Sequence, residues 1–316
     1  MNDLSPFSVV GVARLDPAKF RDPCVTARGE PRARVALTRL ETLWINTGTL
    51  CNLACRTCYI ESSPRNDALV YISLAEAEAF LDQAQEVGTR EIGFTGGEPF
   101  MNPDMIPMID AALGRGFEVL VLTNAMRPMR RFDEALLRLR GDRLTVRVSL
   151  DHYSQAVHEA ERGPDTWDKA IAGCRWLSDN GFRLAIAGRQ LPGESLDDAR
   201  AGYAELFARE GLQVDAGDPA ALVLFPEMDA AADVPEITEA CWGILGKSPA
   251  SIMCATSRMV VKRKGEEHPV VAACTLIPYD PQFTLGETLV EASRPVLLNH
   301  PHCARFCVLG GASCSA

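Results

Sequence analysis

The chain has 316 residues, of which 47% are hydrophobic and 23% charged, and its formal net charge is −10. This composition is that of an ordinary globular protein, and a negative charge without a long Lys/Arg block argues against a nucleic-acid-binding surface. No apolar run approaches the roughly 18–20 residues of a membrane span, and the N-terminus lacks a secretion-signal pattern. We therefore expect a cytoplasmic protein that binds no nucleic acid and no membrane, whose eleven cysteines serve mainly as metal ligands rather than as a disulfide framework.

From residue 40 onward, apolar segments typical of buried strands alternate with amphipathic segments typical of helices. The expected strands cover residues 43–46, 91–95, 117–123, 144–150, 182–188 and 221–225. Helices are expected to begin at Ser73, where Glu76 completes a capping box, and at Asn102-Pro103, and to cover residues 133–139, 165–180 and 195–209. Short connections between alternating strands and helices predict parallel strands and right-handed crossovers. Six such units predict an α/β fold, an open, partial (β/α)6 barrel.

The alternation stops near residue 236. Five cysteines follow residue 250, and only short apolar segments separate them. We therefore expect three parts: an N-terminal extension at residues 1–39, the partial barrel at 40–235 and a small cysteine-rich domain at 236–316.

A cysteine triplet follows the first expected strand. Cys51, Cys55 and Cys58 have C-x3-C-x2-C spacing, and Tyr59 comes directly after them. Three thiolates can hold three irons of a 4Fe–4S cube and leave the fourth iron open, whereas electron-transfer clusters usually take four cysteines. A zinc knuckle or three reduced core cysteines are the alternatives, but zinc sites usually show a second paired C-x2-C unit, which is not seen nearby.

A second motif, Gly96-Gly97-Glu98-Pro99, follows the second expected strand. With the cysteine triplet and the aromatic residue after it, this motif makes residues 40–225 resemble the core of the radical S-adenosylmethionine (SAM) superfamily. The resemblance implies a 4Fe–4S cluster and SAM as cofactors, and an electron donor such as flavodoxin or ferredoxin. It also implies reductive cleavage of SAM to a 5′-deoxyadenosyl radical, which abstracts hydrogen from the substrate.

The same resemblance implies a set of SAM-binding residues at the carboxyl ends of the strands, where ligands bind in such folds. The two glycines let the backbone approach a ligand closely, and the carbonyls of the motif can accept from the SAM ammonium. Asn124 and Ser149 are candidates for the ribose or methionyl part, and Arg189 and Arg162 compete for the methionyl carboxylate. The candidate SAM-binding residues are Tyr59, Gly96, Gly97, Glu98, Pro99, Asn124, Ser149, Arg162 and Arg189.

Polar residues at the same rim are candidates for proton transfer. A radical oxidation needs a proton acceptor besides the hydrogen abstractor, and Asp, Glu, His and Tyr are the usual ones. Asp151, His152 and Tyr153 follow the fourth strand, and Glu227 follows the sixth. For any one of these residues, ordinary polarity of a surface loop is the alternative.

The tail contains a second set of cysteines. Two apolar segments, 258–262 and 270–273, form an expected hairpin with Cys254 and Cys274 at its ends. Together with the pair Cys303 and Cys307, this arrangement resembles the auxiliary-cluster domains called SPASM and twitch. The resemblance implies a second 4Fe–4S cluster bound by these four cysteines, with Cys314 able to replace the last of them. A structural zinc site formed by the same thiolates is the alternative.

The leading functional interpretation is a radical SAM oxidoreductase that abstracts hydrogen from a small molecule, with the auxiliary cluster assisting oxidation or substrate binding. The main alternative is an enzyme that modifies a ribosomally made peptide. Only about 40 residues precede the barrel, which is too few for the leader-binding domain of many peptide maturases, and this favours the small molecule. A non-catalytic iron–sulfur carrier or scaffold is a third possibility, but it has no use for an open iron.

Overall fold

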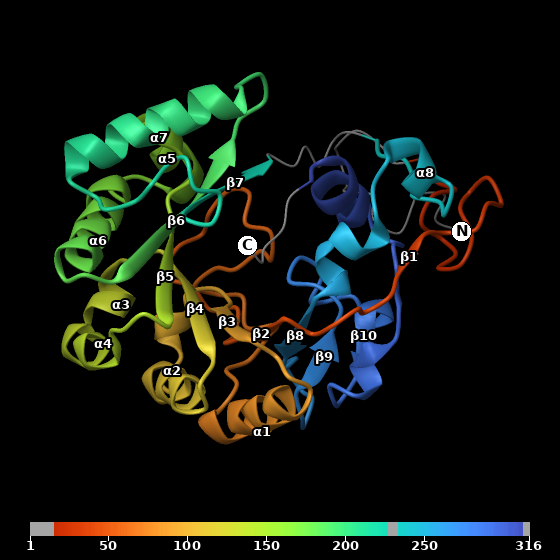
Figure 1. Ribbon diagram of the computed structural model, residues 1–316, viewed down its shortest axis with the longest axis horizontal. Helices are drawn as coiled ribbons and strands as arrows, with labels where there is room; N and C mark the ends of the chain where they lie inside the picture. The colour runs from red at the N-terminus through yellow and green to blue at the C-terminus, as the bar shows by residue number, and fades with distance from the viewer. Residues whose placement is uncertain (1–15, 227–232, 312–316) are drawn as a thin grey trace.

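The computed structural model describes residues 16–226 and 233–311, and its centre is one nine-stranded sheet. The strand order is β10-β9-β8-β2-β3-β4-β5-β6-β7. The strands are β2 (Thr42–Asn46), β3 (Glu91–Thr95), β4 (Glu118–Thr123), β5 (Leu144–Ser149), β6 (Arg183–Gln190), β7 (Leu222–Pro226), β8 (Ser257–Val261), β9 (Val270–Ala272) and β10 (Thr284–Gly286). Strands β2 to β7 are parallel and curve into the predicted partial barrel (Figure 1).

Helices cover the outer, convex side of the barrel strands (Figure 1). They are α1 (Leu74–Glu86), α2 (Met105–Gly114), α3 (Arg127–Arg130), α4 (Asp133–Leu139), α5 (Gln155–Arg162), α6 (Trp167–Asp179) and α7 (Leu196–Glu210), and α8 (Cys241–Leu245) lies in the tail. The capping box predicted for α1 is present: Ser73 Oγ accepts from Glu76 N, and the Glu76 carboxylate accepts from Ser73 N. The short helices α3, α5 and α8 were not predicted.

Helix α2 begins later than its sequence suggests. The Asn102 side chain donates to the carbonyl oxygens of Thr47 and Ile72, at 3.1 and 2.9 Å. Asn102 therefore anchors the loops on either side of the cysteine segment instead of capping a helix, and α2 starts at Met105.

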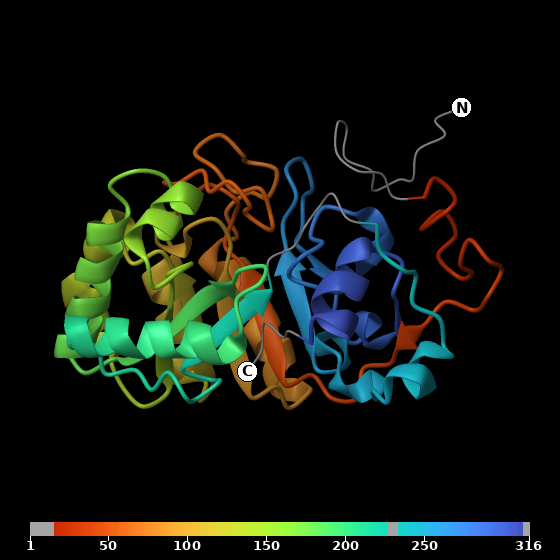
Figure 2. The same ribbon diagram turned by 90° about the horizontal axis from the view of Figure 1, so that it is seen from above.

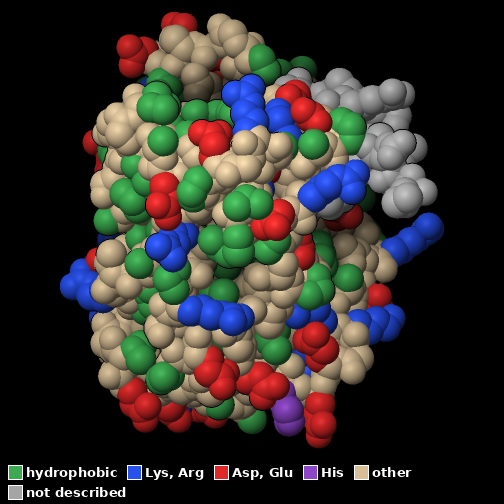
Figure 3. Space-filling view, turned by 90° about the vertical axis from the view of Figure 1, so that its right-hand side faces the viewer, with side chains coloured by type: hydrophobic (Ala, Val, Ile, Leu, Met, Phe, Trp, Pro, Cys, Tyr) green, Lys and Arg blue, Asp and Glu red, His purple; other side chains and the backbone are tan. Residues whose placement is uncertain are grey.

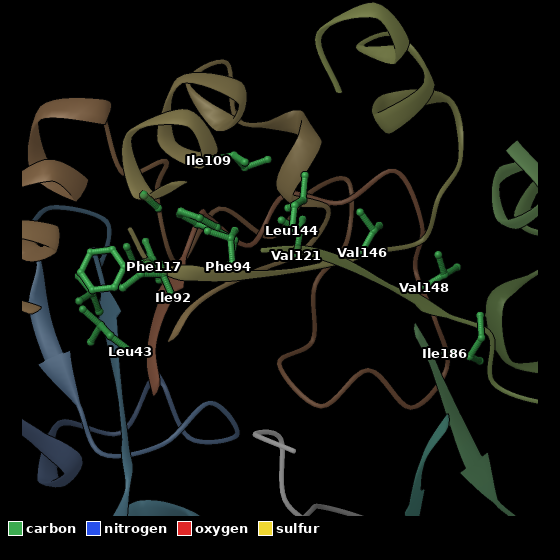
Figure 4. Close-up of a cluster of buried hydrophobic side chains, with 14 of the residues drawn as sticks. Leu43, Ile92, Phe94, Ile109, Phe117, Val121, Leu144, Val146, Val148 and Ile186 are labelled. Atoms are coloured by element: carbon green, nitrogen blue, oxygen red, sulfur yellow. The ribbon is translucent and has the colours of Figure 1, made fainter. Parts of the chain in front are cut away.

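Hydrophobic side chains fill both faces of the sheet. On the outer face, Leu43, Ile92 and Val121 belong to a large cluster beneath the helices (Figure 4). On the inner face, Trp44 is buried against Gly93, whose position leaves no room for a Cβ because one would lie 2.4 Å from the indole. Apolar residues on both faces are typical of parallel strands that are covered on both sides.

The tail continues the barrel sheet. Strand β8 pairs in parallel with β2, and β9 and β10 follow as antiparallel strands, so the predicted β8–β9 hairpin is present and lies at the barrel edge (Figure 2). Strand β1 (Arg34–Val35) pairs with β11 (Val296–Leu297), and buried Arg32 forms an ion pair with Glu236 at 2.6 Å. Residues of the N-terminal extension therefore pack against the tail.

The face over the tail carries acidic and basic side chains interspersed with hydrophobic ones, without a large area of either sign (Figure 3). Within residues 16–226 and 233–311, no helix is both long enough and apolar enough to cross a membrane.

Candidate active site

One cavity opens at the carboxyl ends of the barrel strands, between the barrel and the tail. Its barrel wall consists of residues at or after the ends of β2 to β7, and its tail wall consists of Thr275, Leu276 and Phe306. Eleven of the predicted site residues line it: Cys51, Cys55, Cys58, Tyr59, Gly96, Gly97, Asn124, Ser149, Asp151, Arg162 and Arg189. The fold therefore brings most of the predicted SAM and cluster residues to one place.

The three cysteines of the loop after β2 are suited to binding the cationic core of an iron–sulfur cluster. Leu53 N donates to Cys51 Sγ at 3.4 Å, and Ser62 N donates to Cys58 Sγ at 3.3 Å. Burial raises the pKa of Cys51 to about 12 and also raises that of Cys55. Buried thiols of this kind become thiolates at neutral pH when a metal supplies the compensating positive charge.

Gly96 and Gly97 lie directly against the backbone of the cysteine loop. A Cβ on Gly97 would lie 2.3 Å from the carbonyl oxygen of Leu50, and one on Gly96 would lie 2.5 Å from that of Gly48. Gly97 N also donates to Gly48 O at 2.8 Å. The glycines were predicted to admit a ligand. They line the cavity, but their closest neighbour is the loop that carries the cysteines.

Replacing Gly97 by Ala is therefore expected to displace the cysteine loop. Overpacking of this kind costs about 1–3 kcal/mol, and here the displaced atom is the backbone carbonyl next to Cys51. The G97A protein should bind clearly less iron at the first site, as measured by iron content after anaerobic reconstitution. Gly114→Ala is the matched control, because no heavy atom within 4 Å meets a Cβ at Gly114. A full iron load in G97A would contradict this account.

Glu98 and Pro99 lie behind the cavity wall. The buried Glu98 carboxylate accepts from Asn124 N and Thr123 Oγ1, both at 2.8 Å, and from Phe100 N at 3.2 Å. Burial raises the pKa of Glu98 to about 7. Its side chain joins the end of β3 to the end of β4, so Glu98 positions the loops rather than presenting its carboxylate to a ligand.

Asn124 and Ser149 line the cavity from adjacent strand ends, as predicted for ligand contacts. Asn124 Nδ2 also donates to Asn52 Oδ1 at 2.8 Å. Asn124 thus supports the cysteine loop from the barrel side.

A buried network of charges forms the floor of the cavity beside Cys55. Asp151 accepts from Arg162 through both oxygens, at 2.6 and 3.1 Å, and its Oδ1 accepts from Arg189 Nε at 3.3 Å. Arg189 also donates to Thr57 O at 3.0 Å and lies 3.5 Å from the Glu161 carboxylate. Burial alone would raise the pKa of Asp151, but Arg162 and then Arg189 hold it below its usual value. Asp151 is therefore an ionised partner of two arginines and a weak proton acceptor.

An aromatic cluster closes the cavity where the barrel meets the tail. The Tyr59 ring lies 6.3 Å from Phe225 of β7 and 5.8 Å from Phe306 of the tail, and Phe225 and Phe306 lie 5.4 Å apart. The guanidinium of Arg189 lies 5.1 Å from the centre of the Tyr59 ring. These contacts fix one wall of the cavity as an apolar surface.

His152 and Tyr153 were expected to face the cavity, and the structure places them elsewhere. Their rings stack on each other at 4.0 Å, and Tyr153 Oη donates to Glu194 at 2.8 Å. Tyr153 packs on α7 at Gly202, where a Cβ would lie 2.5 Å from its ring. The chain turns toward α5 after Asp151, so the next two side chains point away from the ligand side; Glu227 lies outside the described residues.

A second, mainly apolar cavity lies in the tail. It is lined by Cys254, Cys274, Cys303 and Cys307. Cys254 precedes β8 and Cys274 follows β9, so the hairpin brings them together as expected, and the other two belong to a π-helical segment, η6 (Cys303–Leu309). Burial raises the pKa of Cys254 to about 11. Cys314 lies outside the described residues.

The two cavities are immediate neighbours. Leu276 lines both of them. Phe306 lines the first cavity, and the adjacent Cys307 lines the second. Among the residues that the structure describes, no three His, Cys, Asp or Glu side chains converge as ligands of one metal ion.

The sequence model of the family described as the radical SAM superfamily matches residues 45–202, which is half of the chain. The chain belongs to the radical SAM superfamily. The matched region begins in β2 and ends in α7, and so contains the cysteine triplet, the two glycines and the Asp151 network.

Curated relatives of this radical SAM protein match it over part of their length. It is 32% identical over 138 residues to the antilisterial bacteriocin subtilosin biosynthesis protein AlbA of Bacillus subtilis, covering 43% of this chain and 30% of AlbA. It is 29% identical over 133 residues to the mycofactocin maturase MftC of Mycobacterium tuberculosis, covering 42% and 33%. It is 30% identical over 139 residues to the AdoMet-dependent heme synthase of Oleidesulfovibrio alaskensis, covering 43% and 34%. Each of these matches thus spans about a third of the relative.

Among solved structures, the fold is similar to Streptococcus suis SuiB bound to S-adenosylmethionine. The TM-score is 0.58 at 14% identity, over 79% of this chain and 63% of SuiB. The family match supports a radical SAM core with a 4Fe–4S cluster and SAM as cofactors, and the auxiliary-cluster tail is consistent with the relatives and with the similar fold. The donor sets fit: three free cysteines line a cavity with room beside Gly96 and Gly97, and four free cysteines line the second.

Several residues at this radical SAM site were not predicted. Glu161 and Thr57 belong to the Arg189 network, and Leu276 separates the two cavities. Glu161 stands next to Arg162 in the sequence, and that adjacency was an available signal. Leu276 carries no chemical signature, because a leucine two residues after a cysteine is consistent with any apolar core.

Proposed function

We propose that this radical SAM enzyme oxidatively modifies a peptide, and that a side chain of the peptide enters the cavity between the barrel and the tail. The observation that carries the proposal is that the three-cysteine loop lines a cavity which shares Leu276 with the neighbouring four-cysteine cavity. A substrate seated there lies against both sites.

The relatives support a peptide substrate. AlbA is named for the biosynthesis of a bacteriocin and MftC is named as a maturase, and SuiB has been solved bound to the precursor peptide SuiA. Because these matches cover only part of each relative, the peptide substrate is our proposal for this chain. A small-molecule substrate, the leading interpretation of the sequence, becomes the second candidate.

The cavity has the chemistry of a site for an apolar or aromatic side chain. Its wall of Tyr59, Phe225 and Phe306 offers large apolar surfaces, which are well suited to such a group. Among the described residues, Asp151 is the one acidic side chain that lines the cavity, and two arginines neutralise it. The cavity therefore offers a cation-rich, ion-paired floor and an apolar wall.

We assign the roles as follows. Cys51, Cys55 and Cys58 would hold the SAM-binding cluster, and Cys254, Cys274, Cys303 and Cys307 the auxiliary one. When bound, the first cluster and SAM supply a radical that abstracts hydrogen from the substrate. Arg162 and Arg189, held by Asp151, orient groups on the cavity floor, while Leu276 and Phe306 exclude water between the two sites.

The test is substrate-dependent turnover. Reconstituted protein, dithionite and SAM would be incubated with synthetic peptides for the short reading frames beside the gene, and separately with a pool of small metabolites. We expect a peptide to stimulate 5′-deoxyadenosine formation and to change mass in the same reaction. Stimulation by a metabolite, with every peptide unchanged, would contradict the proposal.

The second candidate, a small-molecule substrate, is favoured by one observation. The AdoMet-dependent heme synthase aligns over as much of this chain as AlbA does, at 30% against 32% identity. The metabolite arm of the same experiment tests this candidate directly.

A further inference from the structure

Arg258 of β8 is a buried cation whose hydrogen bonds go only to neutral oxygens. Arg258 is 1% exposed to solvent. The guanidinium donates to Cys254 O at 2.6 Å, Ser257 O at 2.7 Å, Ala292 O at 2.8 Å and Arg294 O at 3.2 Å. Among the described residues, no Asp or Glu carboxylate lies within 4 Å of its guanidinium nitrogens.

Two other buried arginines of the described residues have carboxylate partners. Arg32 pairs with Glu236 at 2.6 Å, and Arg189 pairs with Asp151 at 3.3 Å. Burying an ion without a countercharge is costly, so an unpaired buried guanidinium indicates that an anionic group completes its surroundings.

The place of Arg258 in the fold identifies that group. Cys254 lies four residues before Arg258 and accepts a hydrogen bond from its guanidinium through the backbone carbonyl, and Cys254 lines the tail cavity together with Cys274. An arginine guanidinium remains protonated in proteins, so Arg258 is a cation beside the tail cysteines at neutral pH.

We infer that Arg258 is the countercharge of the auxiliary cluster and stabilises its reduced form. A 4Fe–4S cluster with four thiolate ligands is anionic, and one-electron reduction adds a further negative charge. A fixed cation nearby in a low-dielectric interior favours the more negative state, and so raises the reduction potential of the cluster. Arg258 acts through charge and touches no substrate, so it is a positioning and tuning residue.

This inference rests on the proposed auxiliary cluster, so the test begins by counting iron. A full-length variant in which Cys51, Cys55 and Cys58 are all replaced by Ala would be reconstituted, so that the tail holds the remaining cluster. Arg258→Gln, Arg258→Lys and Arg263→Gln would be compared in this background by iron content and by a redox titration followed by electron paramagnetic resonance. Arg263 is the matched control, because it lies beyond β8 in the same hairpin and also donates to a carbonyl, that of Pro278, but has Glu266 as an ionic partner.

In R258Q, we expect the ratio of reduced to oxidised cluster at a fixed ambient potential to fall roughly ten-fold, equivalent to about 59 mV for one electron. R258K keeps the charge and should stay near the parent value, as should R263Q. If R258Q cannot assemble the cluster, R258K should still assemble it.

Three results would overturn the inference. They are an unchanged potential in a fully loaded R258Q, equal shifts in R258Q and R258K, and loss of the cluster in both variants. Absence of tail iron in the parent protein is a different result, because it would remove the proposed auxiliary ligands before Arg258 is considered.

Discussion

Simultaneous replacement of Cys51, Cys55 and Cys58 by Ala is expected to reduce 5′-deoxyadenosine formation from SAM to background. The three sulfurs line one cavity, and that cavity also contains both glycines and the Asp151–Arg162 pair. In the proposed assignment these residues supply the three cluster ligands, so the variant should lose the cluster and with it every electron that could reach SAM. Iron at the tail should remain, because Cys254 and its partners line a separate cavity. Mass spectrometry of the reaction mixture and iron analysis provide the two measurements.

The matched control removes three other thiols. Cys24, Cys174 and Cys241 are free cysteines that line neither cavity. Their joint replacement by Ala should leave iron content and deoxyadenosine formation close to those of the parent protein. If the variant lacking Cys51, Cys55 and Cys58 formed deoxyadenosine at the parent rate, the assignment of these cysteines as cluster ligands would be wrong.

Replacement of Cys254 and Cys274 by Ala is expected to halve the iron bound per chain, from about eight to about four. The two thiols lie at the ends of the β8–β9 hairpin and line the tail cavity with Cys303 and Cys307. A cluster that loses two of four protein ligands should not assemble, whereas the first site keeps all of its own. Cleavage of SAM should therefore persist, while turnover of substrate to product is lost.

Zinc analysis of the same samples decides the nature of the tail site. The cluster assignment predicts iron and sulfide in the tail and no zinc there. The alternative is a structural zinc site in the tail. It would be indicated by an iron content that does not change when the two cysteines are replaced, together with about one zinc per chain in the parent protein. Cys241→Ala is the control for loss of a tail thiol outside the cavity.

Much of the barrel could be predicted because its strands and helices carry local signals. The strand at Glu91–Thr95 and the helix at Asp133–Leu139 have the predicted bounds, and the Ser73–Glu76 capping box is present. The cysteine spacing and the two glycines likewise led to residues that line one cavity, because ligand spacing within one loop is itself a local property.

Features that depend on distant contacts were not accessible in this way. Packing on α7 decides where the side chains of His152 and Tyr153 point. The Glu98 carboxylate accepts a hydrogen bond from Asn124 N at the end of the neighbouring strand. Helix α5 lacks a continuous apolar face, because its buried residues are the polar His158 and Glu161. Pairing of β8 with β2 joins segments some 200 residues apart, and nothing in either segment alone specifies the partner.

The most direct test of the account is a single measurement on the parent protein, purified and reconstituted anaerobically. Iron and sulfide would be counted per chain, and 5′-deoxyadenosine would be measured after addition of dithionite and SAM. We expect about eight irons and formation of deoxyadenosine, because we assign a cluster to each cysteine set and SAM to the first. A protein that holds both clusters yet forms no deoxyadenosine, with or without the peptides tested above, would contradict the claim that it is a radical enzyme.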